Sequence, residues 1–375
     1  MTQTRVGPDG EGSLSAGAQA PAIIDCRGIW KIFGAEHLAP DVRQRILAGE
    51  LDAAQVRSEH GCVMSVQDVS FSVYPGEIFC VMGLSGSGKS TLIRHINRLI
   101  EPTAGDVMID GESICRYNAR ALRALRSTRV GMVFQNMALL PHRSVESNVG
   151  LALELRGVNA AARAQTVAHV LDVVGLGGWA GCQVRELSGG MQQRVGLARA
   201  LAADPGILLM DEPFSALDPL IRRQLQNEFK SLSRDMGKTT VFITHDLDEA
   251  IRLGDRIAIM KDGRFVQVGT PAEIVMQPAD GFVAEFVQGI SRMNVVQAAQ
   301  IMLPLAAYLG EMELQGPRAA DLAHLPRAQT DSPLHALIDL AVGQQQPIAI
   351  YHDGAIAGVV TPRVLLQTVR QGHQA

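Results

Sequence analysis

The sequence predicts an α/β fold built on a largely parallel sheet. Several short apolar runs alternate along the chain with longer stretches that favour helix, and runs of this length are typical of strands covered on both faces. The predicted strands cover 77–82, 130–134, 207–210, 240–244 and 256–260. Residues 145–203 contain no such run, which predicts a helical subdomain inserted into the sheet domain.

Composition and charge limit the class of protein. The 375 residues are 47% hydrophobic and 19% charged, as in ordinary globular proteins, and the net charge is −4. A nucleic-acid binder would usually be basic, so no nucleic-acid partner is expected. We see no signal peptide and no apolar run of about 20 residues. The five cysteines form no CxxC pair, so no zinc site or disulfide framework is expected.

The chain divides into three predicted parts. Residues 1–20 are expected to be flexible, 21–283 to form the main domain, and 284–375 to form a smaller α+β module. Within the main domain, apolar residues at helical spacing predict a short helical insertion over 36–60.

A phosphate-binding motif lies between a predicted strand and a predicted helix. The run from Gly83 to Ser90 matches GxxxxGK[ST], in which glycines let successive backbone N–H groups point at phosphates. Lys89 would supply a positive charge to the β- and γ-phosphates, and Ser90 a hydroxyl to Mg²⁺. A chance glycine-rich turn is the alternative. The full predicted ATP-binding set of this segment is Gly83, Ser85, Gly86, Ser87, Gly88, Lys89, Ser90 and Thr91.

Two carboxylates end the apolar strand at 207–210. Because neighbouring strand residues point in opposite directions, Asp211 could hold Mg²⁺ while Glu212 acts as the general base toward water. The alternative is a solvated acidic pair. His245 ends the next predicted strand and could hydrogen-bond the γ-phosphate, although a lone histidine is more often structural. Gln135 follows another strand and could contact Mg²⁺ or water.

An aromatic residue near the first strand could stack on adenine. Phe33 is our candidate, with Trp30 as its competitor and core packing as the alternative role. A further segment, LSGGMQQR at 187–194, places a Ser-Gly-Gly turn before a predicted helix over 191–203. Helix N-termini bind anions, so a second phosphate site is expected there, at Ser188, Gly189 and Gly190.

These motifs together resemble the ATP-binding subunits of ABC transporters over about 23–285. Gln135 corresponds to the Q-loop, 187–192 to the signature, 208–212 to the Walker B strand, 215–218 with Asp218 to the D-loop, and His245 to the switch histidine. The resemblance implies the P-loop NTPase fold, ATP and Mg²⁺, with Ser90, Gln135 and Asp211 at the metal. It also implies a head-to-tail homodimer in which Ser188, Gly189, Gly190 and Gln192 act on the ATP of the opposite protomer.

A narrower resemblance is to the importers of glycine betaine, proline and related osmoprotectants. It rests on the 36–60 insertion and on stretches such as FQNMALLPH and LMDEPFSALDPLIR. It implies transmembrane permease subunits, an external solute-binding protein, and a peripheral position on the cytoplasmic face of the membrane. An importer of another small solute, or a non-transport ABC ATPase, remains the alternative.

Two regions are expected to mediate further contacts. The resemblance places 134–148 near the membrane subunit, with Met137, Leu139 and Leu140 either exposed for that contact or buried in the helical subdomain. Residues 325–369 resemble one cystathionine-β-synthase-type (CBS) motif. Its usual carboxylate is replaced by Val364, so a structural or dimerising role competes with ligand sensing.

Overall fold

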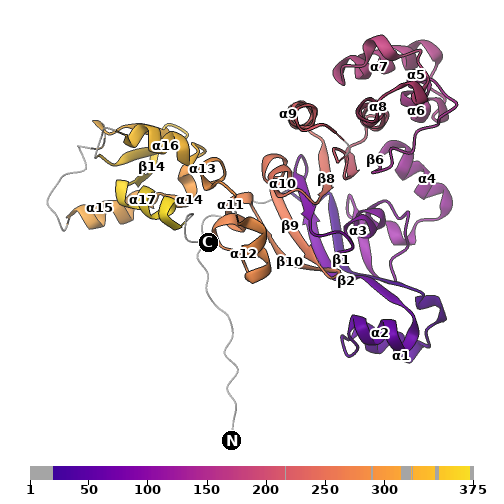
Figure 1. Cartoon of the computed structure of the whole chain (residues 1–375), viewed down its shortest axis with the longest axis horizontal. Helices are drawn as coiled ribbons and strands as arrows, with labels where there is room; N and C mark the ends of the chain where they lie inside the picture. Colours follow the sequence, from indigo (N-terminus) through magenta and orange to yellow (C-terminus); the bar gives the residue numbers. More distant parts are fainter. Residues whose placement is uncertain are drawn as a thin grey trace, which may run out of the picture.

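The computed structural model describes residues 20–215, 217–288, 290–313, 322, 324–342 and 346–371. The expected flexibility of 1–20 concerns residues that, apart from Ala20, lie outside this set. Figure 1 shows the main domain on the right and the C-terminal module on the left. Among the described residues, no helix is both long and apolar enough to cross a membrane.

A six-stranded sheet forms the centre of the main domain. Five of its strands run parallel, and β10 pairs antiparallel with β9 at one edge. Across the sheet the strands are β10 (Arg264–Gly269), β9 (Arg256–Lys261), β3 (Ile78–Met82), β8 (Thr239–Thr244), β7 (Ile207–Asp211) and β6 (Val130–Val133). The five predicted apolar runs are these parallel strands, and β3, β7 and β8 are buried throughout. The α/β prediction is therefore confirmed.

A second, antiparallel sheet covers part of the first. Its order is β2 (Val63–Val73), β1 (Ile24–Phe33), β4 (Ala104–Ile109) and β5 (Glu112–Ser113). One apolar core lies between the two sheets and α3 (Lys89–Ile96), with α4 (Ala119–Thr128) at its edge. In this core Phe71 of β2 stacks on Phe79 of β3 with ring centroids 5.1 Å apart.

Helices occupy the inserted subdomain, as predicted. A second core joins them to the opposite face of the six-stranded sheet. They are α5 (Val145–Val149), α6 (Leu151–Leu155), α7 (Ala160–Val173) and α8 (Gly189–Ala202). The helices that follow the subdomain in the main domain are α9 (Pro219–Asp235), α10 (Leu247–Leu253), α11 (Pro271–Met276) and α12 (Gly281–Val287).

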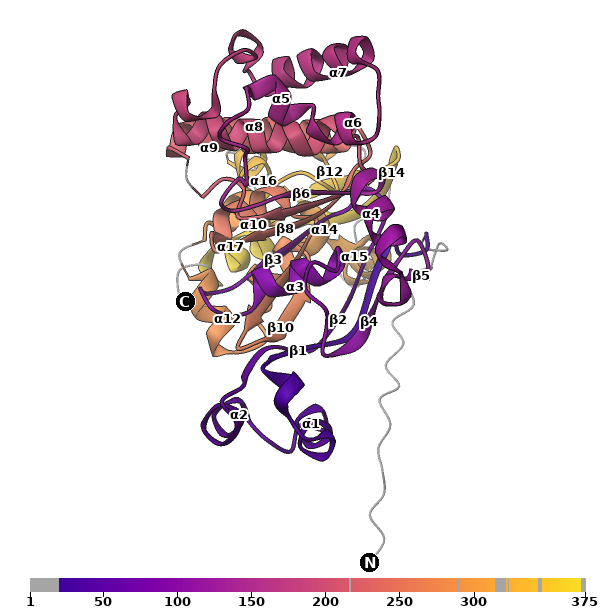
Figure 2. The ribbon, with the colours of Figure 1, turned by 90° about the vertical axis from the view of Figure 1, so that its right-hand side faces the viewer.

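The predicted insertion consists of two short helices. They are α1 (Pro40–Leu47) and α2 (Ala53–His60), and Asp52 begins α2 with a capping box. Their small separate core includes Ile46, Val56 and Trp30. Figure 2 shows this insertion and the helical subdomain at opposite ends of the main domain.

The C-terminal module has its own sheet and core. The sheet order is β11 (Leu303–Pro304), β14 (Ala355–Val360), β13 (Ile348–His352) and β12 (Arg327–Gln329). The helices are α13 (Arg292–Val295), α14 (Ala298–Ile301), α15 (Leu305–Glu313), α16 (Leu334–Ala341) and α17 (Pro362–Gln371). Helix α12 spans the expected boundary at 283/284, and its Val283 belongs to the main-domain core. The boundary and the CBS assignment stay predictions.

Candidate nucleotide site

The glycine-rich loop between β3 and α3 requires glycine at defined positions. Gly86 and Gly88 have φ of +83° and +101°, which L side chains rarely adopt. A Cβ at Gly88 would also lie 2.1 Å from the carbonyl oxygen of Ser65. At Gly86 a Cβ would meet nothing within 4 Å, because this part of the loop faces open space. The loop therefore leaves room for a ligand over its outer face.

Lys89 begins α3 and turns its ammonium back into the loop. Its Nζ donates to the carbonyl oxygens of Gly83 and Leu84, at 2.8 and 2.9 Å. Burial lowers the pKa of Lys89, and the negative charges of Glu212 and Asp211 oppose that effect. A buried cation inside a ring of backbone groups suits a phosphate, which would offset the cost of removing the ammonium from water.

A hydroxyl and a carboxylate meet between α3 and β7. Ser90 Oγ donates to Asp211 Oδ1 at 2.8 Å, and Asp211 is fully buried. Hydroxyl and carboxylate oxygens are the donors that Mg²⁺ prefers, so this pair fits the metal expected with ATP. Arg94 also contacts Asp211, with 3.3 Å from its Nη2 to Oδ2. We did not predict Arg94, but it lies four residues after Ser90 and hence on the same helix face.

Glu212 points away from Asp211 toward two other predicted residues. Both Gln135 Nε2 and His245 Nδ1 lie 3.2 Å from Glu212 Oε2. The backbone of Glu212 is left-handed, with φ of +49°, and its N–H donates to the carbonyl oxygen of Ile243. The strand thus ends at Asp211, and the turn sends the two carboxylates to different partners. A carboxylate held by an amide and an imidazole can accept a proton from a positioned water.

Gln135 joins the Glu212 group rather than the Ser90–Asp211 pair. Its side-chain amide donates to Glu212, and the residue is exposed. His245 is also exposed, with 56% of its side chain accessible, whereas 15% of the Glu212 side chain is accessible.

Of the two aromatic candidates, Phe33 is the exposed one. It ends β1 with 43% exposure, and Lys31 Nζ lies 5.1 Å from its ring centroid. Trp30 is 6% exposed and belongs to the core of the α1–α2 insertion, so its ring is not free to stack on a base.

The remaining residues of the predicted ATP set differ in environment. Ser85 is exposed, whereas Ser87 is buried and its N–H donates to the Leu84 carbonyl at 3.2 Å. Thr91 is half-buried, and its hydroxyl accepts a hydrogen bond from Ser65 Oγ at 3.0 Å. Thr91 therefore joins the motif to β2.

The second predicted anion site is the N-terminus of α8. Ser188 caps the helix by accepting a hydrogen bond from the Met191 N–H at 3.3 Å, and Gly189 begins the helix, two residues earlier than predicted. Gln192 donates through Nε2 to the carbonyl oxygens of Val184 and Leu187, at 3.2 and 3.1 Å. Gln192 thus holds the segment before the turn in place.

The segment that follows Glu212 has its own cap. Asp218 begins α9 by accepting from the Leu220 N–H at 3.0 Å. Ser188, Gly190 and Asp218 line one shallow cavity, which places the turn and the D-loop residue together on one surface.

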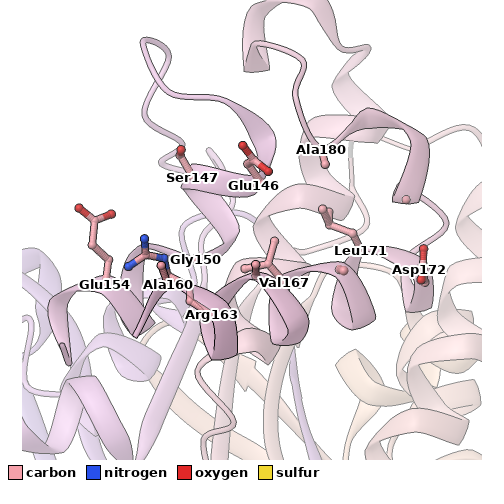
Figure 3. A pocket seen from close by; sticks show the side chains of 13 residues that line it. Glu146, Ser147, Gly150, Glu154, Ala160, Arg163, Val167, Leu171, Asp172 and Ala180 are labelled. Atoms are coloured by element: carbon pink, nitrogen blue, oxygen red, sulfur yellow. The ribbon is translucent and has the colours of Figure 1, made fainter. Parts of the chain in front are cut away.

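Another cavity, of about 330 Å³, lies in the helical subdomain away from the P-loop. Figure 3 shows Val167 and Leu171 of α7 facing Glu146 and Ser147 of α5. Residues Met137, Leu139 and Leu140, which precede α5, were expected to be either exposed for a membrane-subunit contact or buried in the helical subdomain. All three are half-buried, so neither alternative is favoured. Leu139 packs against the main core.

The parallel sheet, the glycine-rich loop and the carboxylates at the end of β7 define a P-loop nucleoside triphosphatase. The comparisons with known proteins specify its class. The ABC transporter family profile matches residues 66–215. The chain belongs to the ABC transporter family and is one of its ATP-hydrolysing, ATP-binding proteins.

Curated relatives align with most of the chain. The glycine betaine transport ATP-binding protein OpuAA of Bacillus subtilis is 49% identical over 284 residues, which cover 76% of this chain and 67% of the relative. The trimethylamine N-oxide transport system ATP-binding protein TmoW of Ruegeria pomeroyi is 48% identical over 289 residues, covering 77% of this chain and 83% of the relative.

A solved structure supports the fold. The dimeric structure of MJ0796, a bacterial ABC transporter cassette, superimposes with a TM-score of 0.57 at 30% identity, covering 66% of this chain and 98% of that one. The post-hydrolysis state of the same cassette, bound to ADP and Pi, is 29% identical with the same TM-score and coverage.

Proposed function

We propose that this chain is the ATPase subunit of an importer for glycine betaine or a related osmoprotectant. The arrangement of Glu212 beside Gln135 and His245, next to the P-loop, carries the hydrolytic part of the proposal. The relatives named for glycine betaine and trimethylamine N-oxide transport, at 48–49% identity, support the solute class. An importer of another small solute is the alternative, because the roles proposed for the ATP-site residues concern the nucleotide and not the solute.

Each residue of the site has a role in this proposal. Lys89 and the N–H groups of the glycine-rich loop hold the β- and γ-phosphates, and Phe33 stacks on adenine. Ser90 and Asp211 hold Mg²⁺, which would neutralise phosphate charge. Glu212 accepts the proton of the attacking water, and His245 orients that water against the γ-phosphate.

Two copies of the chain are proposed to share each ATP. The Ser188 turn and the P-loop of one chain would face their counterparts in a head-to-tail dimer, so that Ser188, Gly189 and Gly190 complete the partner's site. Gln192 is assigned a positioning role through its two carbonyl contacts. The dimeric structure of the cassette of 30% identity supports a dimer of this chain.

The proposed assembly includes transmembrane permease subunits and an external solute-binding protein, with this chain on the cytoplasmic face of the membrane. The expected contact surface comprises 134–148, which leads from Gln135 into α5. Because Gln135 touches Glu212, a movement of this segment would reach the proposed general base directly. The C-terminal module is proposed to have a dimerising or regulatory role.

The proposal is tested by uptake of labelled glycine betaine in cells that carry the importer. The unsubstituted chain should support ATP-dependent accumulation, and Glu212→Gln should abolish it. In purified form Glu212→Gln should bind ATP normally and hydrolyse it roughly 10²–10⁴-fold more slowly, because the amide cannot accept the proton.

Two controls separate the parts of the proposal. Glu228→Gln removes an exposed carboxylate of α9 that lies outside the site and should leave both readouts unchanged. If Glu212→Gln hydrolysed ATP at the parental rate, Glu212 would not be the general base. Uptake of a different solute, with glycine betaine excluded, would favour the alternative importer.

A further inference from the structure

A polar cavity of about 610 Å³ lies where the main domain meets the C-terminal module. Its wall combines α9 and α10 with the segments that begin α11, α13 and α14. Figure 1 shows this junction between α10 and α13, on the side of the main domain that faces the module. The P-loop residues do not line this cavity, so it is separate from the ATP site.

Three basic side chains line the cavity: Lys230 and Arg234 on α9, and Arg252 on α10. Lys230 is half-buried, and its ammonium donates to the carbonyl oxygen of Arg252 at the end of α10. Burial lowers the pKa of Lys230, and the nearby charges of Arg234 and Arg252 lower it further, whereas the carboxylate of Asp255 raises it. Lys230 thus lies near two like charges and one opposite charge, and its ammonium is directly beside the backbone of Arg252.

The acidic residues of the cavity offset only part of this charge. Asp255 lies 3.8 Å from Arg234, and its other oxygen accepts a hydrogen bond from the Ile78 N–H at 2.8 Å. Asp248, the other carboxylate of the wall, is exposed on the first turn of α10. Among the described residues the guanidinium of Arg252 has no hydrogen-bond or ion-pair partner.

We propose that this cavity binds a small phosphate-bearing anion, held chiefly by Lys230 and Arg252. Arginine and lysine donate charge-assisted hydrogen bonds to phosphate oxygens, and the anion would relieve the repulsion between the two cations. Amides and a hydroxyl from the module side, at Gln297, Gln300 and Ser291, complete the polar wall. The volume exceeds the roughly 30 Å³ share of a water molecule many times over, so a phosphate or pyrophosphate fits.

The position of the site gives the ligand a way to act on ATP hydrolysis. Helix α10 begins two residues after His245, and α9 begins directly after Asp218. An anion that bridges these helices to α13 and α14 would couple the module to both. This part of the argument rests on the proposed function, whereas the binding itself does not.

The binding is tested by calorimetry with inorganic pyrophosphate on the full chain carrying Lys89→Ala, which weakens the competing P-loop site. We expect about one pyrophosphate per chain. Adding Lys230→Gln and Arg252→Gln should weaken binding at least tenfold. Adding instead Arg223→Gln, an exposed arginine on α9 that does not line the cavity, should leave binding unchanged.

Two outcomes would overturn the proposal: no binding by the Lys89→Ala chain, or equal binding after the two cavity substitutions. Thermal melting checks that the variants are folded. If the double variant melts early, Arg252→Gln alone replaces it, because its guanidinium has no partner to lose. In a chain with Lys89 intact, Lys230→Gln/Arg252→Gln should hydrolyse ATP at the parental rate without pyrophosphate. If the unsubstituted chain itself hydrolysed no ATP, that result would count against the proposed function and not against anion binding in the cavity.

Discussion

Single residues of the site carry buried charge that the neighbouring side chains offset only in part. Lys89 is buried among carbonyl oxygens, and Asp211 is fully buried beside a hydroxyl and an arginine. Such groups cost free energy when desolvated, and a triphosphate with its metal would supply the opposite charges at both places. The site is therefore arranged for a charged ligand rather than for maximal stability of the free chain.

The exposed ring of Phe33 leads to a prediction on ATP affinity. Phe33→Ala should raise the ATP dissociation constant roughly 5- to 150-fold, because base–aromatic stacking contributes about 1–3 kcal/mol. Phe33→Tyr keeps the ring and should bind like the parent. Equilibrium titration with a fluorescent ATP analogue measures both, and an unchanged constant for Phe33→Ala would assign adenine recognition elsewhere.

His95 predicts a pH dependence of stability. It is fully buried on α3, its Nδ1 lies 2.8 Å from the Ile100 carbonyl oxygen, and its Nε2 has no hydrogen-bond partner among the residues that the structure describes. Burial lowers its pKa from 6.5 to about 4. Below pH 6.5 the unfolded chain therefore binds the proton first, so the free energy of unfolding falls as the pH drops from 6.5 toward 4, by up to about 3 kcal/mol.

Chemical denaturation at several pH values checks this dependence. His95→Gln has no such proton to bind, so its stability should fall less steeply between pH 7 and 4 than that of the parent. His37→Gln changes a histidine whose side chain is 83% exposed and should follow the parent curve. Parallel curves for His95→Gln and the parent would contradict the assignment.

The sequence located the catalytic candidates but not all of their partners. Lys89, Ser90 and Asp211 were predicted because a motif and an apolar strand mark their positions. Arg94 was missed, since an arginine on a helix face is usually solvated. Gln135 was expected to contact Mg²⁺ or water, which stays a prediction. Its contact with Glu212 was not foreseen, because a pattern of residues cannot specify which of two adjacent carboxylates an amide will touch.

At the scale of elements, the parallel strands were predictable and the antiparallel sheet was not. Strands such as β3 and β7 are buried throughout and therefore read as continuous apolar runs. Strands β2 and β4 alternate buried and accessible residues, and β1 has irregular register at Cys26–Ile29. A half-buried, irregular strand has a much weaker pattern, which is why β2, β4 and β5 were not predicted.

The α1–α2 insertion should unfold independently of the main domain. Ile46 is fully buried in its separate small core, and large-to-small changes at such sites cost about 2–5 kcal/mol. Ile46→Ala should therefore raise amide hydrogen exchange in Pro40–Leu47 and Ala53–His60, with β7 and α3 protected as before. Gln44→Ala, at an exposed position of the same helix, is the control. If amide protection fell equally in the insertion, β7 and α3, the insertion and the main domain would unfold as one cooperative unit.

At the scale of the whole molecule, one chain carries both segments that we propose as the two halves of an ATP site. The loop at Gly83–Ser90 follows β3, whereas the Ser188 turn begins α8 in the helical subdomain. The hydrogen bonds of the Ser188 turn stay within 184–192. A second copy in head-to-tail orientation would bring the turn of one chain to the loop of the other, which explains why both motifs are present in each chain.

Mixing two inactive variants tests this arrangement. Lys89→Ala removes the ammonium that would bind the phosphates but leaves the Ser188 turn intact. Ser188→Arg places a bulky side chain in the turn but leaves the P-loop intact. In a mixed head-to-tail dimer, the intact loop of one chain faces the intact turn of the other, so one of two sites is complete. An equimolar mixture should therefore recover up to roughly a quarter of the parental ATPase rate, although each variant alone is inactive. A mixture as inactive as its components, with mixed dimers demonstrated by cross-linking, would exclude a site shared between the two chains.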